Sequence, residues 1–265
     1  MSIASTISNE AAELALENVS VSFPIYHSGS QSLKKNILFR GSGGHLGSDA
    51  KHRIIVEALR NVSMQFHAGD RVALVGSNGA GKTTLLRVMA GVYEPVSGIV
   101  RSRGRISPMF DISLGIDSEV SGYDNIRLRG MILGLTANEI EERMGDIVEF
   151  TELGDYLEIP VRTYSAGMMT RLTFAVATCF APEILLMDEW IMAGDAGFLV
   201  KAQHRIESFV SQASILVLAS HSLETCRRFC NKGVWLDQGM VKAEGPIDQV
   251  LDAYTGGSSD KTLRT

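Results

Sequence analysis

The sequence has few cysteines, and their spacing gives no sign of a disulfide framework or a zinc ribbon. Cys179, Cys226 and Cys230 are the only three, and no two of them form a C-x-x-C pair. One interpretation of His221, Cys226 and Cys230 is a metal site. Leu223 and these two cysteines recur at i, i+3 and i+7, however, which favours buried thiols that pack as small hydrophobic groups on one helical face.

Other absences exclude further classes of protein. The longest purely apolar runs are about five residues, whereas a membrane-spanning helix needs about 20. The 25 basic residues are fewer than the 30 acidic ones, which gives a net charge of −5 and no global basic field for nucleic acid. Residues 1–10 lack the cationic and apolar regions of a secretory signal, so a cytoplasmic location is expected.

The length and composition of the chain are typical of a folded protein with one large or two small domains. The length is 265 residues, of which 45% are hydrophobic and 21% charged, as in average globular proteins. Strand and helix patterns alternate, which predicts a doubly wound α/β protein with a mixed or mainly parallel sheet. The expected strands are residues 15–23, 54–66, 71–75, 99–106, 184–187 and 215–219, with a hairpin turn at 237–239, and the expected helices are residues 82–90, 137–150, 166–180, 198–212 and 246–254.

Three stretches depart from this rhythm. Residues 112–165 look helical throughout, which predicts an inserted helical subdomain. Within residues 27–52, glycine-serine arms flank a short basic amphipathic segment at 32–40. This segment is either a surface loop or a contact for a membrane partner or lipid headgroups. Residues 255–265 are expected to form a polar tail.

A phosphate-binding pattern follows the expected strand 71–75. Residues 76–83 match G-x-x-x-x-G-K-[ST], and an apolar helix comes next. The glycines let successive N–H groups face phosphate oxygens, and the helix N-terminus adds its positive dipole end. Lys82 would bridge the β- and γ-phosphates, and the Thr83 hydroxyl would bind Mg²⁺. The expected nucleotide-binding residues in this loop are Gly76, Ser77, Asn78, Gly79, Ala80, Gly81, Lys82, Thr83 and Thr84.

Two other expected strands end in polar residues at the edge where open α/β sheets bind ligands. Asp188 and Glu189 follow strand 184–187, and His221 follows strand 215–219. Asp188 would bind Mg²⁺ through water, and Glu189 would act as general base on the attacking water. His221 would hydrogen-bond the γ-phosphate and this water, the alternative being a satisfied side chain after a core strand.

In this order the motifs resemble those of ATP-binding cassette (ABC) ATPases, the nucleotide-binding subunits of ABC transporters. Tyr164-Ser165-Ala166-Gly167-Met168 is similar to the L-S-G-G-Q signature of that family, with three substitutions, and Ser165 is a suitable N-cap for the next helix. The resemblance covers about residues 15–254. It implies a P-loop NTPase fold with a RecA-like mixed sheet core, an inserted helical subdomain and an N-terminal antiparallel β subdomain, all within one nucleotide-binding domain of residues 1–260.

The resemblance also implies the cofactors and further site residues. ATP and Mg²⁺ would bind between two copies of the chain in a homodimer, where Ser165, Ala166, Gly167 and Met168 contact the ATP of the partner. Asp195 matches the D-loop, which aligns the facing site. The family has a glutamine at the entry to the helical subdomain, but here Asp111 is the nearest polar residue. Phe23 is the expected aromatic on adenine, with Tyr26 as the alternative.

Further features narrow the resemblance. Residues 110–116, the pair Arg171-Leu172 after the signature, Gly194-Asp195 and the insertion after residues 23–26 look like those of ATPases that export O-antigen, capsular polysaccharide or teichoic acid. This implies two ATPases and two membrane permease subunits that export lipid-linked polysaccharide, with this chain peripheral at the cytoplasmic face of a bacterial inner membrane and no nucleic acid as partner. The alternatives are a motor for a lipid or drug, or a soluble ABC ATPase acting on ribosomes or DNA.

Overall fold

Two β-sheets and a group of helices make up the described part of the chain. The structure is a computed structural model, and it describes residues 11–24, 45–48, 54–110, 115–189 and 196–259. The first sheet has four antiparallel strands in the order β2-β3-β1-β5. The second has six strands in the order β10-β9-β4-β8-β7-β6, of which only the β9–β10 pair is antiparallel.

The strands match the expected ones at most positions. The β9–β10 hairpin turns at Gln238 and Gly239, which both have a positive φ, as a tight two-residue turn requires. The strands are β1 (Glu13–Pro24), β2 (His45–Ser48), β3 (Ile54–His67), β4 (Arg71–Val75), β5 (Ser97–Arg103), β6 (Ile106–Met109), β7 (Ile184–Asp188), β8 (Ile215–Ala219), β9 (Lys232–Asp237) and β10 (Met240–Pro246).

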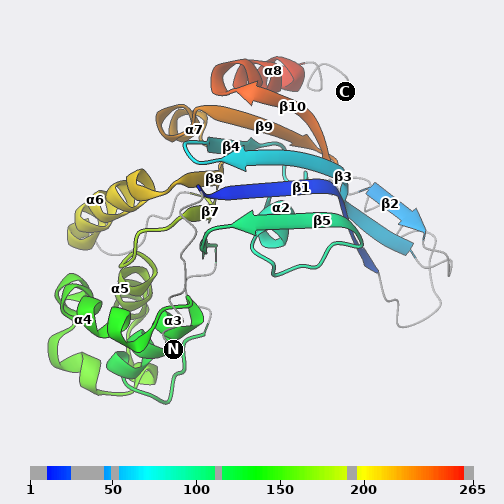
Figure 1. Cartoon of the computed structure of the whole chain (residues 1–265). Helices are drawn as coiled ribbons and strands as arrows, with labels where there is room; N and C mark the ends of the chain where they lie inside the picture. The colour runs from blue at the N-terminus through cyan, green and yellow to red at the C-terminus, as the bar shows by residue number, and fades with distance from the viewer. Residues whose placement is uncertain (1–10, 25–44, 49–53, 111–114, 190–195, 260–265) are drawn as a thin grey trace, which may run out of the picture.

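The helices α3, α4 and α5 gather at one end of the molecule, away from β2 and α8 (Figure 1). Helix α4 begins with the capping box that Thr136 and Glu139 predict. Within the described residues, no helix combines the length and apolar character needed to cross a bilayer. The helices are α2 (Lys82–Met89), α3 (Gly122–Ile132), α4 (Ala137–Thr151), the 3₁₀ turns η2 (Gly154–Glu158) and η3 (Val161–Thr163), α5 (Ala166–Ala177), α6 (Ala196–Gln212), α7 (Leu223–Phe229) and α8 (Ile247–Ser259).

Strands β4, β7 and β8 of the second sheet are buried on both faces, which explains their continuous apolar sequences. In β4, Ala73 and Val75 face a core shared with α3 to α7, whereas Val72 and Leu74 face a core shared with α2 and the first sheet. Successive side chains of a strand point to opposite faces, so each strand contributes to both cores. Strands β7 and β8 lie inside the sheet, as predicted. They run parallel to β4, so the carboxyl ends of all three strands lie on the same side of the sheet.

The prediction of one strand over residues 99–106 is wrong. Strand β5 ends at Arg103 and pairs with β1, whereas β6 begins at Ile106 and pairs with β7 in the other sheet. Gly104 lies between them with a φ of +109°, a conformation that favours glycine. This residue therefore turns the chain from the antiparallel sheet into the mixed one.

Candidate functional site

The loop between β4 and α2 has a backbone that only glycine can adopt at two points. Gly81 has a φ of +107°, and a Cβ built there would lie 2.7 Å from the Ala58 carbonyl oxygen. At Gly76, with a φ of +154°, a Cβ would lie 2.3 Å from the carbonyl oxygen of Leu236. The turn of the β9–β10 hairpin contacts the loop, since the Gly239 N–H donates to the Ala80 carbonyl at 3.0 Å. The loop is thus held tightly by its neighbours.

Helix α2 begins at this loop with uncapped N–H groups. Gly81 is its N-cap and offers no side-chain acceptor, and the first turn contains no acidic residue. The first N–H groups of a helix have no partner inside the helix, and the helix dipole favours a negative charge beside them. Ser77, Asn78 and Gly79 are exposed on the same loop, and the side chain of Thr83 is exposed in the first turn. This arrangement suits a phosphate group.

Lys82 lies inside the loop. Its Nζ donates to the carbonyl oxygens of Gly76 at 2.7 Å and Ser77 at 3.2 Å, and the residue is 8% exposed. Burial lowers the pKa of its ammonium group, and the nearby negative charges of Asp188 and Glu189 oppose this shift. An ammonium group has three N–H donors, so one remains to bind an anion in the loop.

The ends of β7 and β8 bring the acidic pair and the histidine together, as predicted. Glu189 donates its backbone N–H to the Ala219 carbonyl at 2.8 Å. Its carboxylate accepts a hydrogen bond from the Ser220 hydroxyl at 3.2 Å and lies 3.9 Å from Nε2 of His221. Because β8 pairs with β4, these groups lie one and two strands away from the phosphate-binding loop.

Ser220 is a site residue that the sequence reasoning missed. It is 2% exposed, and its hydroxyl accepts from the Ser222 N–H at 3.1 Å while donating to Glu189. The hydroxyl therefore orients the Glu189 carboxylate. The signal available in the sequence was the position of Ser220, directly between a core strand and His221.

The Ser165–Met168 segment forms the start of α5. Ser165 is the N-cap, as predicted, and its Oγ accepts from the Met168 N–H at 3.2 Å. Ser165, Ala166 and Gly167 are exposed, whereas Met168 is partly buried against the helical core. Figure 1 shows α5 beside α4 and away from α2, so one chain does not bring this segment to its own phosphate-binding loop.

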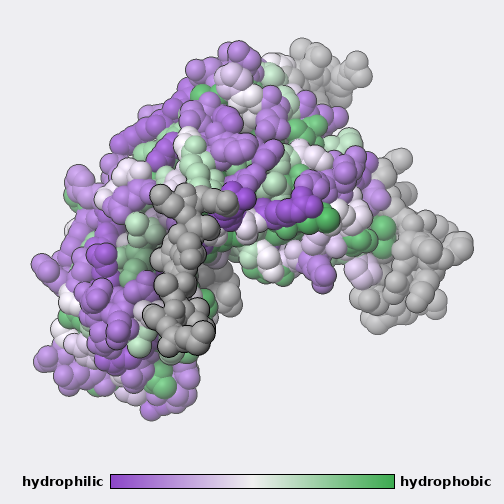
Figure 2. Space-filling view, in the orientation of Figure 1, coloured by the Kyte–Doolittle hydropathy of each residue, from purple (hydrophilic) through white to green (hydrophobic). Residues whose placement is uncertain are grey.

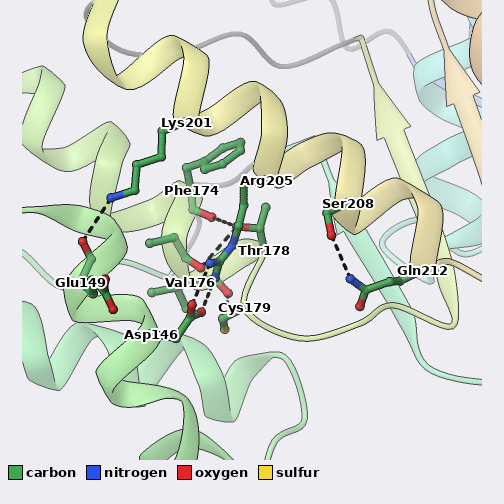
Figure 3. A network of polar contacts seen from close by, with 11 residues as sticks. Asp146, Glu149, Phe174, Val176, Thr178, Cys179, Lys201, Arg205, Ser208 and Gln212 are labelled. Atoms are coloured by element: carbon green, nitrogen blue, oxygen red, sulfur yellow. Dashed lines mark hydrogen bonds and ion pairs between the residues drawn. The ribbon is translucent and has the colours of Figure 1, made fainter.

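A set of charged and aromatic contacts holds α6 against α4, and α5 with them (Figure 3). The Arg205 guanidinium contacts both carboxylate oxygens of Asp146 at 3.0 and 2.5 Å, and its Nε donates to the Thr178 hydroxyl at 3.3 Å. It also lies 4.6 Å from the centre of the Phe150 ring. Because Thr178 is the C-cap of α5 and Ser165 is its N-cap, this cluster joins the helix that begins with the predicted signature residues to α4 and α6.

Lys201, Arg171 and Glu152 extend this cluster. Lys201 and Arg171 each donate to the Glu152 carboxylate, at 2.9 and 3.1 Å. The Arg171 guanidinium lies 4.9 Å from the ring centre of Phe198, which packs against Phe150 and Phe174 in the core. The helices are therefore joined by an aromatic core with cations at its rim.

Phe23 lies near the end of β1 and is 37% exposed. Its ring contacts the ring of Tyr93 edge to face, with centroids 5.3 Å apart and an interplanar angle of 71°. Part of the ring thus remains open to a ligand. The other candidate, Tyr26, lies outside the described residues, as do Asp111, Asp195 and the segment 32–40.

Cys226 and Cys230 are buried in the core on the helical face of the second sheet, as their spacing predicted. Burial raises the pKa of the Cys226 thiol to about 11 and that of the Cys230 thiol to about 12. Thiols with such pKa values are poor metal ligands at neutral pH, because the thiolate is the ligand form.

Comparisons with known proteins agree on one family. The model of the ABC transporter family matches residues 59–192. The chain is 42% identical over 231 residues to the O-antigen export system ATP-binding protein RfbE of Yersinia enterocolitica, covering 87% of this chain and 97% of that one. It is 40% identical over 200 residues to the O-antigen export system ATP-binding protein RfbB of Myxococcus xanthus, covering 76% of this chain but 46% of that one.

A solved ATP-binding subunit of an ABC transporter has the same fold, with a TM-score of 0.64 and 23% identity, over 91% of this chain and 93% of that one. The predicted fold class is therefore confirmed.

Proposed function

The chain belongs to the ABC transporter family and is an ABC ATPase, and on this premise we propose that it is the motor subunit of a bacterial exporter of lipid-linked cell-surface polysaccharide. The observation that carries the proposal is the 42% identity to RfbE, which extends over 97% of that O-antigen export protein. A relationship over nearly the whole of a relative supports a shared cargo class better than one confined to the phosphate-binding motif. The alternative is a motor for a lipid or drug, which unchanged surface polysaccharide in a Lys82→Ala strain would favour.

ATP would bind with its phosphates in the loop of residues 76–81. The free N–H groups at the start of α2 and the Lys82 ammonium would hold the β- and γ-phosphates. Glu189 would accept a proton from a water molecule as the water oxygen attacks the γ-phosphorus and the bond to ADP breaks. Ser220 would orient Glu189, and His221, 3.9 Å from the same carboxylate, would bind the water and the γ-phosphate.

Two oxygen donors suit the expected Mg²⁺. The Thr83 hydroxyl is exposed in the first turn of α2, and the partly buried Asp188 carboxylate ends β7. Magnesium prefers oxygen ligands and is held in such sites by one or two protein groups together with waters and phosphate oxygens. Among the described residues, no group of three or more His, Cys, Asp or Glu side chains is placed to hold a metal ion. Bound Mg²⁺ would neutralise charge on the phosphates.

The start of α5 supports a dimer. Its exposed N-terminus, like that of α2, has N–H groups beyond the one that Ser165 caps and no acidic residue in the first turn. Because it lies away from the phosphate loop of the same chain, we propose that Ser165, Ala166, Gly167 and Met168 contact the ATP of a second copy. Asp195 would align that facing site, Asp111 would occupy the position of the family glutamine, and Phe23, or alternatively Tyr26, would stack on adenine.

The proposed assembly contains two copies of this chain and two membrane permease subunits at the cytoplasmic face of the inner membrane. Residues 1–260 would form one nucleotide-binding domain, in which residues 27–52 are an insertion and 112–165 the helical subdomain. The expected polar tail of residues 255–265 does not begin where predicted, because α8 continues to Ser259. The acidic net charge of −5 gives no support to a nucleic-acid partner.

The ATPase mechanism is tested with purified chain carrying Glu189→Gln or Lys82→Ala. Glu189→Gln should bind ATP with the affinity of the parent and form an ATP-dependent dimer, but it should hydrolyse ATP at least about 100-fold more slowly, because only the general base is lost. Lys82→Ala should instead lose ATP affinity. Hydrolysis at the parent rate by Glu189→Gln would refute the assignment of the base.

The cargo is tested in the source organism by a chromosomal Lys82→Ala substitution, with Lys242→Ala on exposed β10 as the matched control. We expect Lys82→Ala to remove polysaccharide from the surface and accumulate it inside the cell, as measured by gel and antibody staining, while Lys242→Ala behaves like the parent. Unchanged surface polysaccharide, with the variant stably expressed and no second exporter present, would refute polysaccharide as the cargo.

A further inference from the structure

The proposed contacts to the adenine base and to the phosphates come from different sheets. Phe23, the proposed adenine contact, belongs to β1 in the antiparallel sheet, whereas the phosphate loop follows β4 in the mixed sheet. The distance between the base and the triphosphate is set by the nucleotide. Binding both ends at once therefore requires a contact that fixes the Phe23 ring relative to α2.

Tyr93 is tied to α2 through both its backbone and its side chain. After α2, the N–H groups of Val92 and Tyr93 donate to the Arg87 carbonyl at 2.8 and 3.3 Å. The Tyr93 hydroxyl accepts from the Arg87 guanidinium at 2.9 Å, and this guanidinium lies 5.6 Å from the centre of the Tyr93 ring. Because Arg87 lies in the last turn of α2, Tyr93 keeps a fixed position relative to the phosphate-binding helix.

The other side of Tyr93 faces β1. Its ring meets the Phe23 ring at 5.3 Å in the edge-to-face geometry that aromatic pairs prefer. The Val96 N–H, three residues further on, donates to the Ser20 carbonyl of β1 at 2.8 Å. Phe23, Val92 and Val96 are exposed hydrophobic residues. Figure 2 shows hydrophobic surface mixed with polar surface in the region of the antiparallel sheet. The segment after α2 thus joins this helix to β1 beside the partly exposed Phe23.

We propose that Tyr93 is the positioning residue of the base site: it sets the plane of Phe23 and carries the position of α2 to the ring that stacks on adenine. This inference rests on the proposed function, in which Phe23 contacts adenine. Tyr93 acts through Phe23 and does not itself touch the nucleotide.

The test compares two ligands that share the phosphate site. ATP uses both the loop and the base site, whereas inorganic tripolyphosphate uses the loop alone. Affinities of the full-length chain for both are measured by titration calorimetry with Mg²⁺ present. Tyr93→Leu should weaken ATP binding about fivefold, the scale of one aromatic pair, and leave tripolyphosphate binding unchanged. Tyr93→Phe, which keeps the ring and loses the Arg87 hydrogen bond, should weaken ATP binding by a smaller factor of about two.

Val92→Ala is the matched control, since Val92 is the neighbouring residue and is 56% exposed. It should bind both ligands like the parent. A purely structural role for Tyr93 would lower both affinities together, which would overturn the inference. Parent-like ATP binding by a folded Tyr93→Leu would overturn it as well.

A Phe23→Leu variant separates this inference from the proposed function. If Phe23→Leu weakens ATP binding selectively and Tyr93→Leu does not, the role of Tyr93 is refuted and the adenine contact stands. If Phe23→Leu binds ATP like the parent, the adenine contact of Phe23 is refuted, and the role of Tyr93 with it.

Discussion

Replacing Arg205 should destabilise the chain far more than replacing an arginine whose ion pairs are exposed at the surface. Arg205 joins α6 to α4 through both oxygens of Asp146 and through the face of the Phe150 ring. Its side chain is 18% exposed, compared with 49% for that of Asp146. Methionine is the chosen substitute, because it keeps the aliphatic packing and removes only the guanidinium.

The magnitude follows from these contacts. Hydrogen bonds to charged groups contribute about 1.5–3 kcal/mol, and the half-exposed Asp146 places this pair at the lower limit. The cation–π contact adds about 0.5–1 kcal/mol. A loss of about 2 kcal/mol, at about 2–4 °C per kcal/mol for a chain of this size, lowers the melting temperature by about 4–8 °C.

The assay is thermal unfolding followed by circular dichroism, with Arg227→Met as the control. Arg227 makes ion pairs with Asp248 and Asp252, but its side chain is 45% exposed and those of its partners are 73% and 74% exposed. Exposed pairs contribute little, so we expect a change of about 2 °C or less. Equal melting temperatures for the two variants would refute the argument that burial and the Phe150 contact give the Arg205 cluster its strength.

Three further predictions concern the loop, the helix cap and the thiols. Gly81→Ala should cost about 1–3 kcal/mol of unfolding free energy and abolish ATP binding, because its Cβ would strike the Ala58 carbonyl, whereas Gly91→Ala, with a φ of +72° but open space around it, should cost less and bind ATP normally. Ser165→Ala should lower the unfolding free energy by about 1 kcal/mol and Ser165→Asn should not, as urea titration would show; equal losses would refute the cap. Burial raises the pKa of the three thiols to about 11 or 12, so unfolding releases their protons above the ordinary thiol pKa of about 8.5, and the unfolding free energy should fall from about pH 9 to 11. A variant with all three cysteines replaced by alanine should show a shallower fall, and an equal slope in urea titrations would contradict the burial argument.

The sequence predicts best what local periodicity and short motifs determine. The continuous apolar strands, the capped helix α4 and the glycine-rich loop each follow from residues adjacent in sequence, and each appears where expected. Lys82 and Glu189 could be placed at one sheet edge because parallel strands share that edge. The position of these side chains at one edge of the sheet therefore follows from the strand topology alone.

Contacts between distant segments could not be predicted in this way. Residues 99–106 have a continuous strand pattern, and nothing in it shows that the φ of Gly104 sends its two halves to different sheets. Arg205 and Asp146 are 59 residues apart, and Tyr93 meets Phe23 only after two sheets have packed together. Helix α8 also continues to Ser259, beyond the expected end at residue 254, through glycines and serines that are weak helix formers.

Stability and ATP turnover favour different residues at position 189, because of the backbone conformation of Glu189. Its φ is +70°, in the left-handed region where a glutamate is strained by about 1–3 kcal/mol and glycine is not. A library scored by survival after heating should therefore enrich glycine or asparagine at residue 189. Those variants would lack the proposed general base, so the most heat-resistant variants recovered would not hydrolyse ATP. Engineering of this chain therefore has to measure ATP turnover and heat resistance together.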